Sequence, residues 1–166
     1  GTTYDQVAKL IADFAASRDH FGRSVAIAGD TIVVGSPWDD DAGTNTGSAY
    51  VFRTSDGGAT YGQVAKLTAA DAAVGDDLGY RLAIHGDTVV VGAATGPDST
   101  GSKSGAAYIF RTTDGGATYG QVAKLTADDA AAGDRFGTSV AIDGDTIVVG
   151  AHYDDGYTGS AYVFRT

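Results

Sequence analysis

Residues 134–151 read DRFGTSVAIDGDTIVVGA, and two close variants precede them: DHFGRSVAIAGDTIVVGS at 19–36 and DDLGYRLAIHGDTVVVGA at 76–93. The copies recur with a period of 57 to 58 residues. A fixed period of a few tens of residues is typical of repeat architectures such as propellers. We therefore expect one repeat domain, residues 1–166, with repeats at approximately 1–54, 55–112 and 113–166, each starting with its outer strand.

The composition favours strands and turns over helices. All 21 acidic residues are Asp, and the chain contains 25 Gly. Asp suits turns because its short side chain bonds nearby backbone N–H groups, and frequent Gly marks many turns between short strands. The chain is therefore predicted to be an all-β protein with almost no helix.

Each repeat is interpreted as four antiparallel strands, which in the first repeat are Gln6–Leu10, Ser24–Ile27, Thr31–Gly35 and Ser48–Arg53. The first strand mixes polar and apolar residues, as an outer strand facing water does. The third is apolar on both faces, which predicts that both faces are buried. The pair Ala28-Gly29 is predicted to form the two-residue turn between the second and third strands.

Charge and residue usage argue against several classes of function. A net charge of −10 with scattered Lys and Arg opposes nucleic-acid binding. The apolar runs fall far short of the roughly 20 residues that a membrane-spanning helix needs, so membrane insertion is not expected. The absence of Cys excludes disulfides and thiol chemistry. No nucleophile motif or phosphate-binding glycine loop is present, so no enzymatic activity is expected.

The repeated motifs resemble the FG-GAP repeat family, which forms the blades of the integrin α-chain β-propeller and of many bacterial and algal surface proteins. The matching motifs are Phe21-Gly22 with Gly35-Ser36-Pro37, Phe136-Gly137 with Gly150-Ala151, and the looser Leu78-Gly79 with Gly92-Ala93. The resemblance implies propeller blades. Many family members carry a longer calcium loop of the Asp-x-Asp-x-Asp-Gly type, which this chain lacks, so those calcium sites are not carried over.

Three blades are too few to close a propeller, which needs roughly four to eight. The chain is read as starting at a fourth strand and ending at a third, so each end is an incomplete blade. We therefore expect a partial propeller completed by self-association, either as a homodimeric ring or as a head-to-tail polymer. The competing folds are the β-trefoil and the β-prism, which close with three four-stranded units in one chain.

One Asp occupies the same place in each repeat, two residues before the Phe-Gly position, as Asp19, Asp76 and Asp134. Such repetition suits a turn residue that bonds the backbone in each blade. The three are therefore interpreted as structural, like Phe21, Gly22, Gly79, Phe136 and Gly137 of the repeated motif.

The copies differ most in the loop between their third and fourth strands, which contains Trp38, Thr95-Gly96-Pro97-Asp98 or Tyr153. Variable loops on a rigid scaffold are where function tends to lie. Two interpretations stand side by side. The first is a ligand site in which Trp38, Tyr153 and Tyr157 stack on a sugar while Asp39, Asp41, Asp154 and Asp155 bind calcium. The second is a set of solvated turn aspartates beside aromatic residues that cover the blade edge.

The leading hypothesis is a non-enzymatic, extracellular or cell-surface module for structural assembly or adhesion, whose partner is itself, a cell-surface protein or a glycan. The first alternative is a lectin-like, calcium-assisted glycan-binding module; otherwise no cofactor is expected. The second alternative is an engineered or excised repeat fragment without activity of its own, because the chain has no Met and its repeats are nearly identical.

Overall fold

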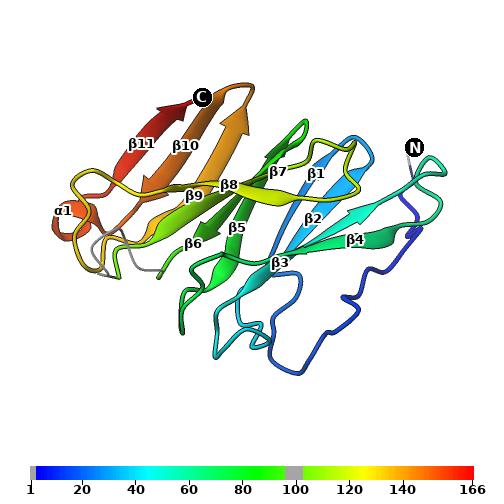
Figure 1. Ribbon diagram of the computed structural model, residues 1–166, viewed down its shortest axis with the longest axis horizontal. Coiled ribbons are helices and arrows are strands. Elements are labelled where there is room, and N and C mark those ends of the chain that lie inside the picture. The colour runs from blue at the N-terminus through cyan, green and yellow to red at the C-terminus, as the bar shows by residue number, and fades with distance from the viewer. Residues whose placement is uncertain (1–2, 96–102) are drawn as a thin grey trace.

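The computed structural model describes residues 3–95 and 103–166, so Gly96, Pro97 and Asp98 of the second variable loop lie outside the described residues. Within this part the strands form three antiparallel sheets, which we call blades 1, 2 and 3 (Figure 1). Blade 1 contains β1 (Ser24–Ala28), β2 (Thr31–Ser36), β3 (Ser48–Arg53) and β4 (Gly62–Leu67). Blade 2 contains β5 (Leu78–His85), β6 (Thr88–Ala93), β7 (Ala106–Arg111) and β8 (Gly120–Leu125). Blade 3 contains β9 (Phe136–Asp143), β10 (Thr146–Ala151) and β11 (Ser160–Arg165).

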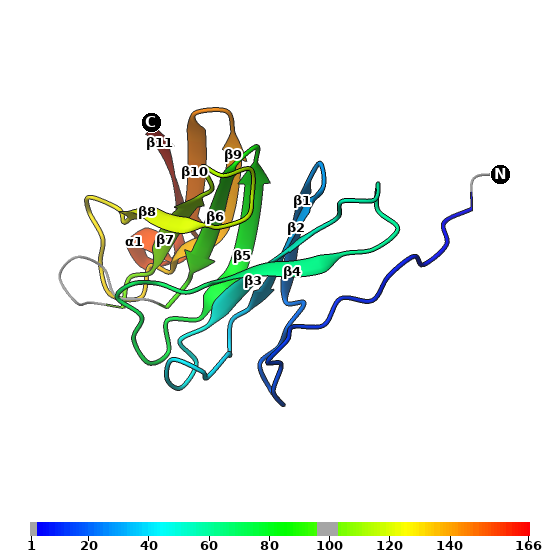
Figure 2. The same ribbon diagram turned by 45° about the vertical axis from the view of Figure 1, so that its right-hand side comes forward.

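Each blade is a meander of consecutive strands, in the order β1-β2-β3-β4 and β5-β6-β7-β8 for the four-stranded pair. This confirms the predicted all-β repeat and its blade-like units, which stand face to face in a row. The row does not close into a ring: the N-terminal segment leaves the molecule on the side of blade 1 and the C-terminus lies in blade 3, at opposite ends (Figures 1 and 2). The sheets stack face to face in a row with a separate core between each neighbouring pair, whereas the units of a β-trefoil or β-prism surround one shared axis.

The predicted turn is shifted by one residue. Ala28 is the last residue of β1 and pairs with Thr31, so the loop is Gly29-Asp30 rather than Ala28-Gly29. Gly29 has a φ of 54°, whereas neither Ala28 nor Asp30 has a positive φ. A single positive φ at the first loop position, filled by Gly, is typical of a type II′ hairpin turn. The motif therefore specifies a Gly-Asp turn, and the residue before the Gly remains in the strand.

The outer strand of each four-stranded blade comes from the repeat that follows that blade. β4 and β8 begin the second and third repeats, yet they pair with β3 and β7 of the preceding blades. The predicted strand Gln6–Leu10 was wrong for this structure, because residues 3–12 form no strand. The physical reason is that a strand needs a neighbour for its backbone hydrogen bonds. Within the described residues, no preceding blade offers one.

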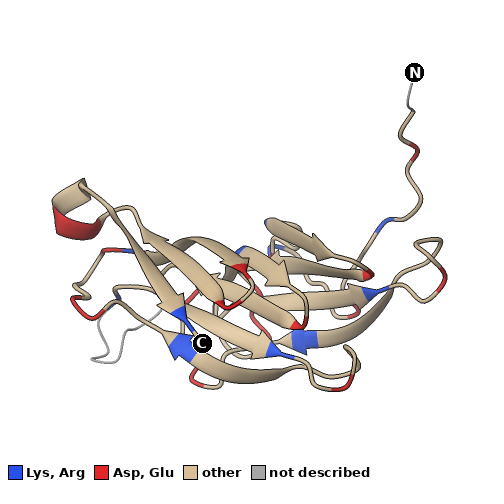
Figure 3. Ribbon diagram, turned by 90° about the horizontal axis from the view of Figure 1, so that it is seen from above, with Lys and Arg blue, Asp and Glu red and all other residues tan. Residues whose placement is uncertain are grey.

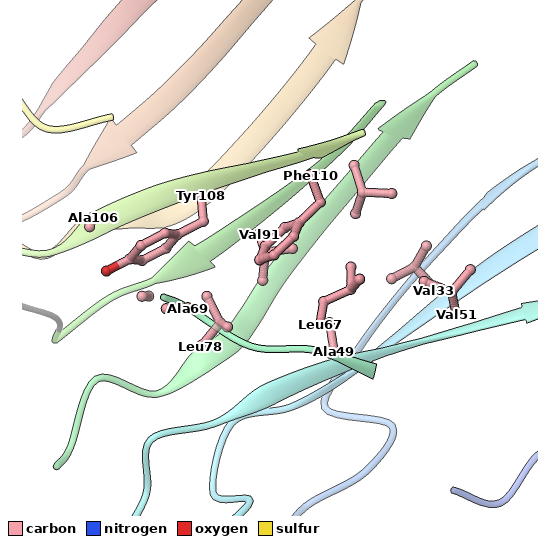
Figure 4. Close-up of a cluster of buried hydrophobic side chains, with 12 residues drawn as sticks. Val33, Ala49, Val51, Leu67, Ala69, Leu78, Val91, Ala106, Tyr108 and Phe110 are labelled. Atoms are coloured by element: carbon pink, nitrogen blue, oxygen red, sulfur yellow. The ribbon is translucent and has the colours of Figure 1, made fainter. Parts of the chain in front are cut away.

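The main core lies between neighbouring blades. Val33, Ala49 and Val51 of blade 1 are fully buried against apolar residues of blade 2 (Figure 4). The blade 2 residues in this cluster include Leu78, Val89, Val91, Tyr108 and Phe110. A second cluster joins blade 2 to blade 3 through residues that include Val90, Ile109, Phe136 and Val149. Successive blades therefore stabilise each other by burying apolar side chains between their faces.

Helical structure is confined, in the described part, to α1 (Asp154–Tyr157), a four-residue turn. Asp155 and Gly156 within it have positive φ angles, so it is not a regular helix. No described helix has the length and hydrophobicity to cross a membrane.

Candidate functional site: the open faces of blades 1 and 3

The glycines of the Phe-Gly motif let the backbones of successive blades approach closely. Gly79 has a φ of 93°, and a Cβ atom there would overlap the carbonyl oxygen of Ser48 in blade 1. The Gly79 carbonyl in turn accepts a hydrogen bond from the Ser24 hydroxyl at 2.7 Å. Gly137 occupies the same place between blades 2 and 3, where a Cβ would overlap the Ala106 carbonyl oxygen. Glycine is required at both positions because φ is positive and because a side chain would overlap the backbone of the neighbouring blade.

Blade 1 exposes the corresponding surface on its outer side, which we call the N-terminal face. Gly22 has the same backbone conformation as Gly79, with a φ of 92°, but a Cβ there would meet nothing within 4 Å. Val25 and Ile27 are 67% and 66% exposed, whereas their equivalents in blade 2, Leu82 and Ile84, pack against the core. This face therefore has the form of one half of a blade–blade interface.

Blade 3 exposes the complementary half, which we call the C-terminal face. Its β10 alternates between half-buried and buried residues, whereas β2 and β6 are buried over most of their length. Val163 is 65% exposed, although the equivalent residue of blade 1, Val51, is fully buried. The outward residues of this face include Ser139, Ala141, Val148, Ala161 and Val163. This face therefore presents small and apolar side chains that no described blade covers.

The predicted turn aspartates each hold the loop that enters a blade. The Asp19 carboxylate accepts the backbone N–H of Ala16 at 2.7 Å. Asp76 and Asp134 accept the N–H groups of Ala73 and Ala131 in the same way, at 2.7 and 2.6 Å. This is the backbone-bonding geometry of a repeated turn, and it fixes the chain just before each Phe-Gly position.

The first variable loop folds over a buried carboxylate. Asp39 is 2% exposed and accepts hydrogen bonds from the Ser48 hydroxyl at 2.7 Å, the Tyr50 hydroxyl at 2.6 Å and the Lys66 ammonium at 3.0 Å. Lys66 also binds Asp41 at 2.5 Å. Burial opposes ionisation of Asp39, but the hydrogen bonds from Tyr50, Lys66 and Ser48 outweigh it and lower its pKa. Asp39 and Asp41 thus bind their own chain.

The third loop repeats this arrangement without a lysine. Asp154 is 5% exposed and accepts the Tyr162 hydroxyl at 3.0 Å, and Asp129 accepts the same hydroxyl at 3.0 Å. Hydrogen bonding from Ser160 lowers the pKa of Asp154. Burial and the two carboxylates raise the pKa of Tyr162. Neither Asp129 nor Asp154 has an ion-pair partner among the described residues. The neighbouring Asp155 is exposed.

Each of the aromatic residues Trp38 and Tyr153 contacts the side chain that precedes the Phe-Gly motif of its own repeat. Trp38 is 41% exposed and stacks against His20, with ring centroids 3.9 Å apart. Tyr153 takes the same place in blade 3, where the Arg135 guanidinium lies 4.7 Å from its ring centre. Both rings are thus partly covered by the residue at the same repeat position, which is a histidine in blade 1 and an arginine in blade 3.

A hollow of about 400 Å³ lies beside Tyr153 and is lined by residues that include Asp129, Asp154, Asp155 and Tyr157. Tyr157 is 75% exposed. Asp39 and Asp41 lie in blade 1 and do not line this hollow. In residues 3–95 and 103–166, no three His, Cys, Asp or Glu side chains form a group able to hold a metal ion.

Acidic residues gather in the turns and loops at the ends of the strands, as Figure 3 shows in red. The open faces carry little charge by comparison, since their outward residues are small or apolar. This distribution separates the apolar faces from the solvated rims of the blades.

The sequence pattern alone does not mark several residues that hold the blades and their loops together or lie on the open faces. Ser24, Lys66 and Ser139 look like ordinary strand residues, and none was selected as a site. Lys66 and Lys124 recur one repeat apart within identical strands, GQVAKL. This recurrence is the sequence signal that could have identified them, and the structure places them opposite Tyr50 and Tyr108.

Two comparisons with known proteins were informative: one identifies the family of the chain, and the other finds no individual relative. A search of the curated proteins finds no match to the chain. A family model described as the FG-GAP repeat matches three segments, residues 4–52, 61–110 and 119–164. The matched segments span the three structural repeats and most of the sequence. The chain therefore belongs to the FG-GAP repeat family.

Proposed function

We propose that this chain is a non-enzymatic module for structural assembly, which works by binding a second copy of itself through the open faces of blades 1 and 3. The observation that carries the proposal is the equivalence of these faces to the two halves of the internal interfaces. Gly22, Val25 and Ile27 correspond to Gly79, Leu82 and Ile84, which blade 1 covers. A heterologous contact of this type closes into a ring or continues as a filament.

The hydrophobic effect supplies the driving force for such a contact. Each internal interface buries a cluster of valine, leucine and aromatic side chains, and burying apolar surface contributes roughly 25 cal/mol per Å². Leaving both outer faces in water forgoes this stabilisation. Association also suits the charge distribution, because the aspartates lie on the rims and not on the faces (Figure 3).

The solution mass tests the proposal. Multi-angle light scattering over a concentration series should give about twice the chain mass for a two-chain ring, or a heavy, growing distribution for a filament. Calcium and a chelator should leave this mass unchanged, since the faces that associate are apolar. A monodisperse monomer at all concentrations would contradict the proposed assembly.

We place this assembly outside the cell or on its surface, with adhesion to a cell-surface protein or glycan as the wider role. The support is the family: its blades resemble those of surface proteins, and the net charge of −10 keeps such a module soluble. Appearance of the chain in the external fraction of its source cells would agree with this location, and recovery in the cytosol would contradict it.

The second candidate function is glycan binding, and the hollow beside Tyr153 favours it. An exposed Tyr157 and the Asp155 carboxylate offer a stacking surface and hydrogen-bond acceptors at one place. A glycan array should then show binding that Tyr157→Ala abolishes and that Tyr4→Ala, at another exposed tyrosine, leaves intact. A blank array for the unmodified chain would remove this candidate. The array is run with calcium and with chelator to test calcium assistance.

A further inference from the structure

We propose that Arg23 and Arg81 together bind an oxyanion at the junction of blades 1 and 2, where both guanidinium groups lie over the ring of Tyr80. The ligand is a single sulfate or carboxylate group, present as a free ion or carried by an acidic saccharide. A single group is expected because the net charge of −10 repels a longer polyanion. This inference goes beyond the proposed self-association and does not depend on it.

Two guanidinium groups from neighbouring blades meet at one aromatic ring. Arg23 directly precedes β1, and its Cζ atom lies 4.6 Å from the centre of the Tyr80 ring. Arg81 belongs to β5, and its Cζ atom lies 4.8 Å from the same centre. The electrons of the ring attract both cations. A guanidinium that stacks on a ring keeps the N–H groups at its edge for other partners, so donors of both arginines are gathered around Tyr80.

A β-bulge holds the tyrosine and one of the two arginines in place. The ladder between β5 and β6 shifts register between Leu78 and Arg81, which leaves Gly79 and Tyr80 as extra residues in β5. A bulge of this kind redirects a side chain relative to the regular strand. The Arg81 guanidinium also donates a hydrogen bond to the backbone carbonyl of Tyr80 at 2.9 Å. Because these groups are ordered before a ligand arrives, binding costs less conformational entropy.

The packing of the blades does not explain this group of side chains, because the repeats differ at these positions. The three copies read Gly22-Arg23-Ser24, Gly79-Tyr80-Arg81 and Gly137-Thr138-Ser139. The glycine recurs in every copy, as a residue with a role in packing does. In the third copy the Thr138 hydroxyl lies 3.0 Å from the ring nitrogen Nδ1 of His152 instead. The arrangement of two arginines around one tyrosine is therefore specific to the junction of blades 1 and 2.

Neither arginine is neutralised by an aspartate, although the chain contains 21 of them. Among the described residues the ion pairs involve Lys66, Lys124 and His85, and none involves Arg23 or Arg81. More distant aspartates are largely screened beyond about 8 Å at physiological ionic strength. The planar guanidinium matches the paired oxygens of a carboxylate or sulfate group and binds them with charge-assisted hydrogen bonds. The two unpaired cations are thus suited to an oxyanion from solution.

Isothermal titration calorimetry tests the site with three probes at constant ionic strength: sodium sulfate, a sulfated uronic-acid disaccharide and a neutral disaccharide. The first two should bind at one site per chain, and the neutral disaccharide should give no binding heat. Arg23→Ala and Arg81→Ala should each weaken binding about tenfold or more, the loss expected when a charge-assisted hydrogen bond is removed. Circular dichroism of each variant checks that it is folded.

Further variants separate the guanidinium pair from general charge. Arg111→Ala is the matched control, because Arg111 is also exposed but its Nε atom donates to the Thr88 hydroxyl at 3.2 Å in blade 2; it should leave binding unchanged. Arg23→Lys keeps the charge but loses the planar fork, so it should weaken binding. Tyr80→Phe keeps the ring and should preserve binding, whereas Tyr80→Leu removes the ring and should weaken it.

The three probes also distinguish the source of the oxyanion. Equal affinity for sulfate and for the charged disaccharide would mean that the site recognises the oxyanion alone, and at least tenfold tighter binding of the disaccharide would identify an acidic saccharide. No binding heat from either, equal binding of the neutral disaccharide, or affinity unchanged by both alanine variants would overturn the inference. A monomer in light scattering would contradict the proposed assembly and leave the oxyanion site standing.

Discussion

Replacing Gly79 with alanine should destabilise the chain by about 4 kcal/mol or more, among the largest effects expected of one methyl group. Gly79 has a φ of 93°, which an L-residue rarely adopts, and its Cβ would overlap the Ser48 carbonyl of the neighbouring blade. Strain at such a φ alone costs about 1–3 kcal/mol. The backbone overlap adds the cost of separating blades 1 and 2. Urea denaturation monitored by circular dichroism measures the loss.

Gly22→Ala is the matched control because Gly22 has the same φ, to within a degree, and open space where a Cβ would lie. It should cost only the conformational strain, about 1–3 kcal/mol. It should also reduce self-association, because the added methyl group lies on the N-terminal face. Equal destabilisation by Gly22→Ala and Gly79→Ala would show that blades 1 and 2 do not approach closely in solution.

The repeat made most of the fold predictable. Strand positions follow from alternating and continuous apolar runs, such as Thr31–Gly35, because one or two buried faces impose those patterns on a strand. The turn was placed one residue early because Ala28-Gly29 and Gly29-Asp30 both satisfy a glycine-containing hairpin. Only the pairing of Ala28 with Thr31 distinguishes them, and pairing is a property of two strands together.

The candidate site was less predictable because it depends on which of the three repeats has another blade packed against it. Gly22, Gly79 and Gly137 are equivalent in sequence and share one backbone conformation, yet only the latter two touch another blade. Likewise Asp39 reads as a solvated loop residue, since the hydroxyls and the ammonium that surround it come from β3 and β4. A local pattern cannot report contacts that form between different strands of a blade or between neighbouring blades.

Asp39→Ala should destabilise the chain by about 3 kcal/mol, the second large effect. The substitution leaves the hydroxyls of Tyr50 and Ser48, both in fully buried residues, without their acceptor and removes one of the two ion-pair partners of Lys66. A buried polar group without a partner loses its hydration and gains nothing in return. Thermal and urea unfolding measure the change. Asp154→Ala is the matched control and should cost less, because its carboxylate binds Tyr162 but no lysine among the described residues.

The pH dependence of unfolding isolates the charge of Asp39. Its folded pKa lies below the ordinary value of 3.8, so ionised Asp39 favours the folded state. This contribution is fully present above about pH 4 and is lost as the pH falls through the folded pKa. Asp39→Asn keeps the volume and one acceptor, so it should lower stability at pH 7 and flatten the decline in stability below pH 4. A decline as steep as that of the unmodified chain would mean that other carboxylates control the acid transition.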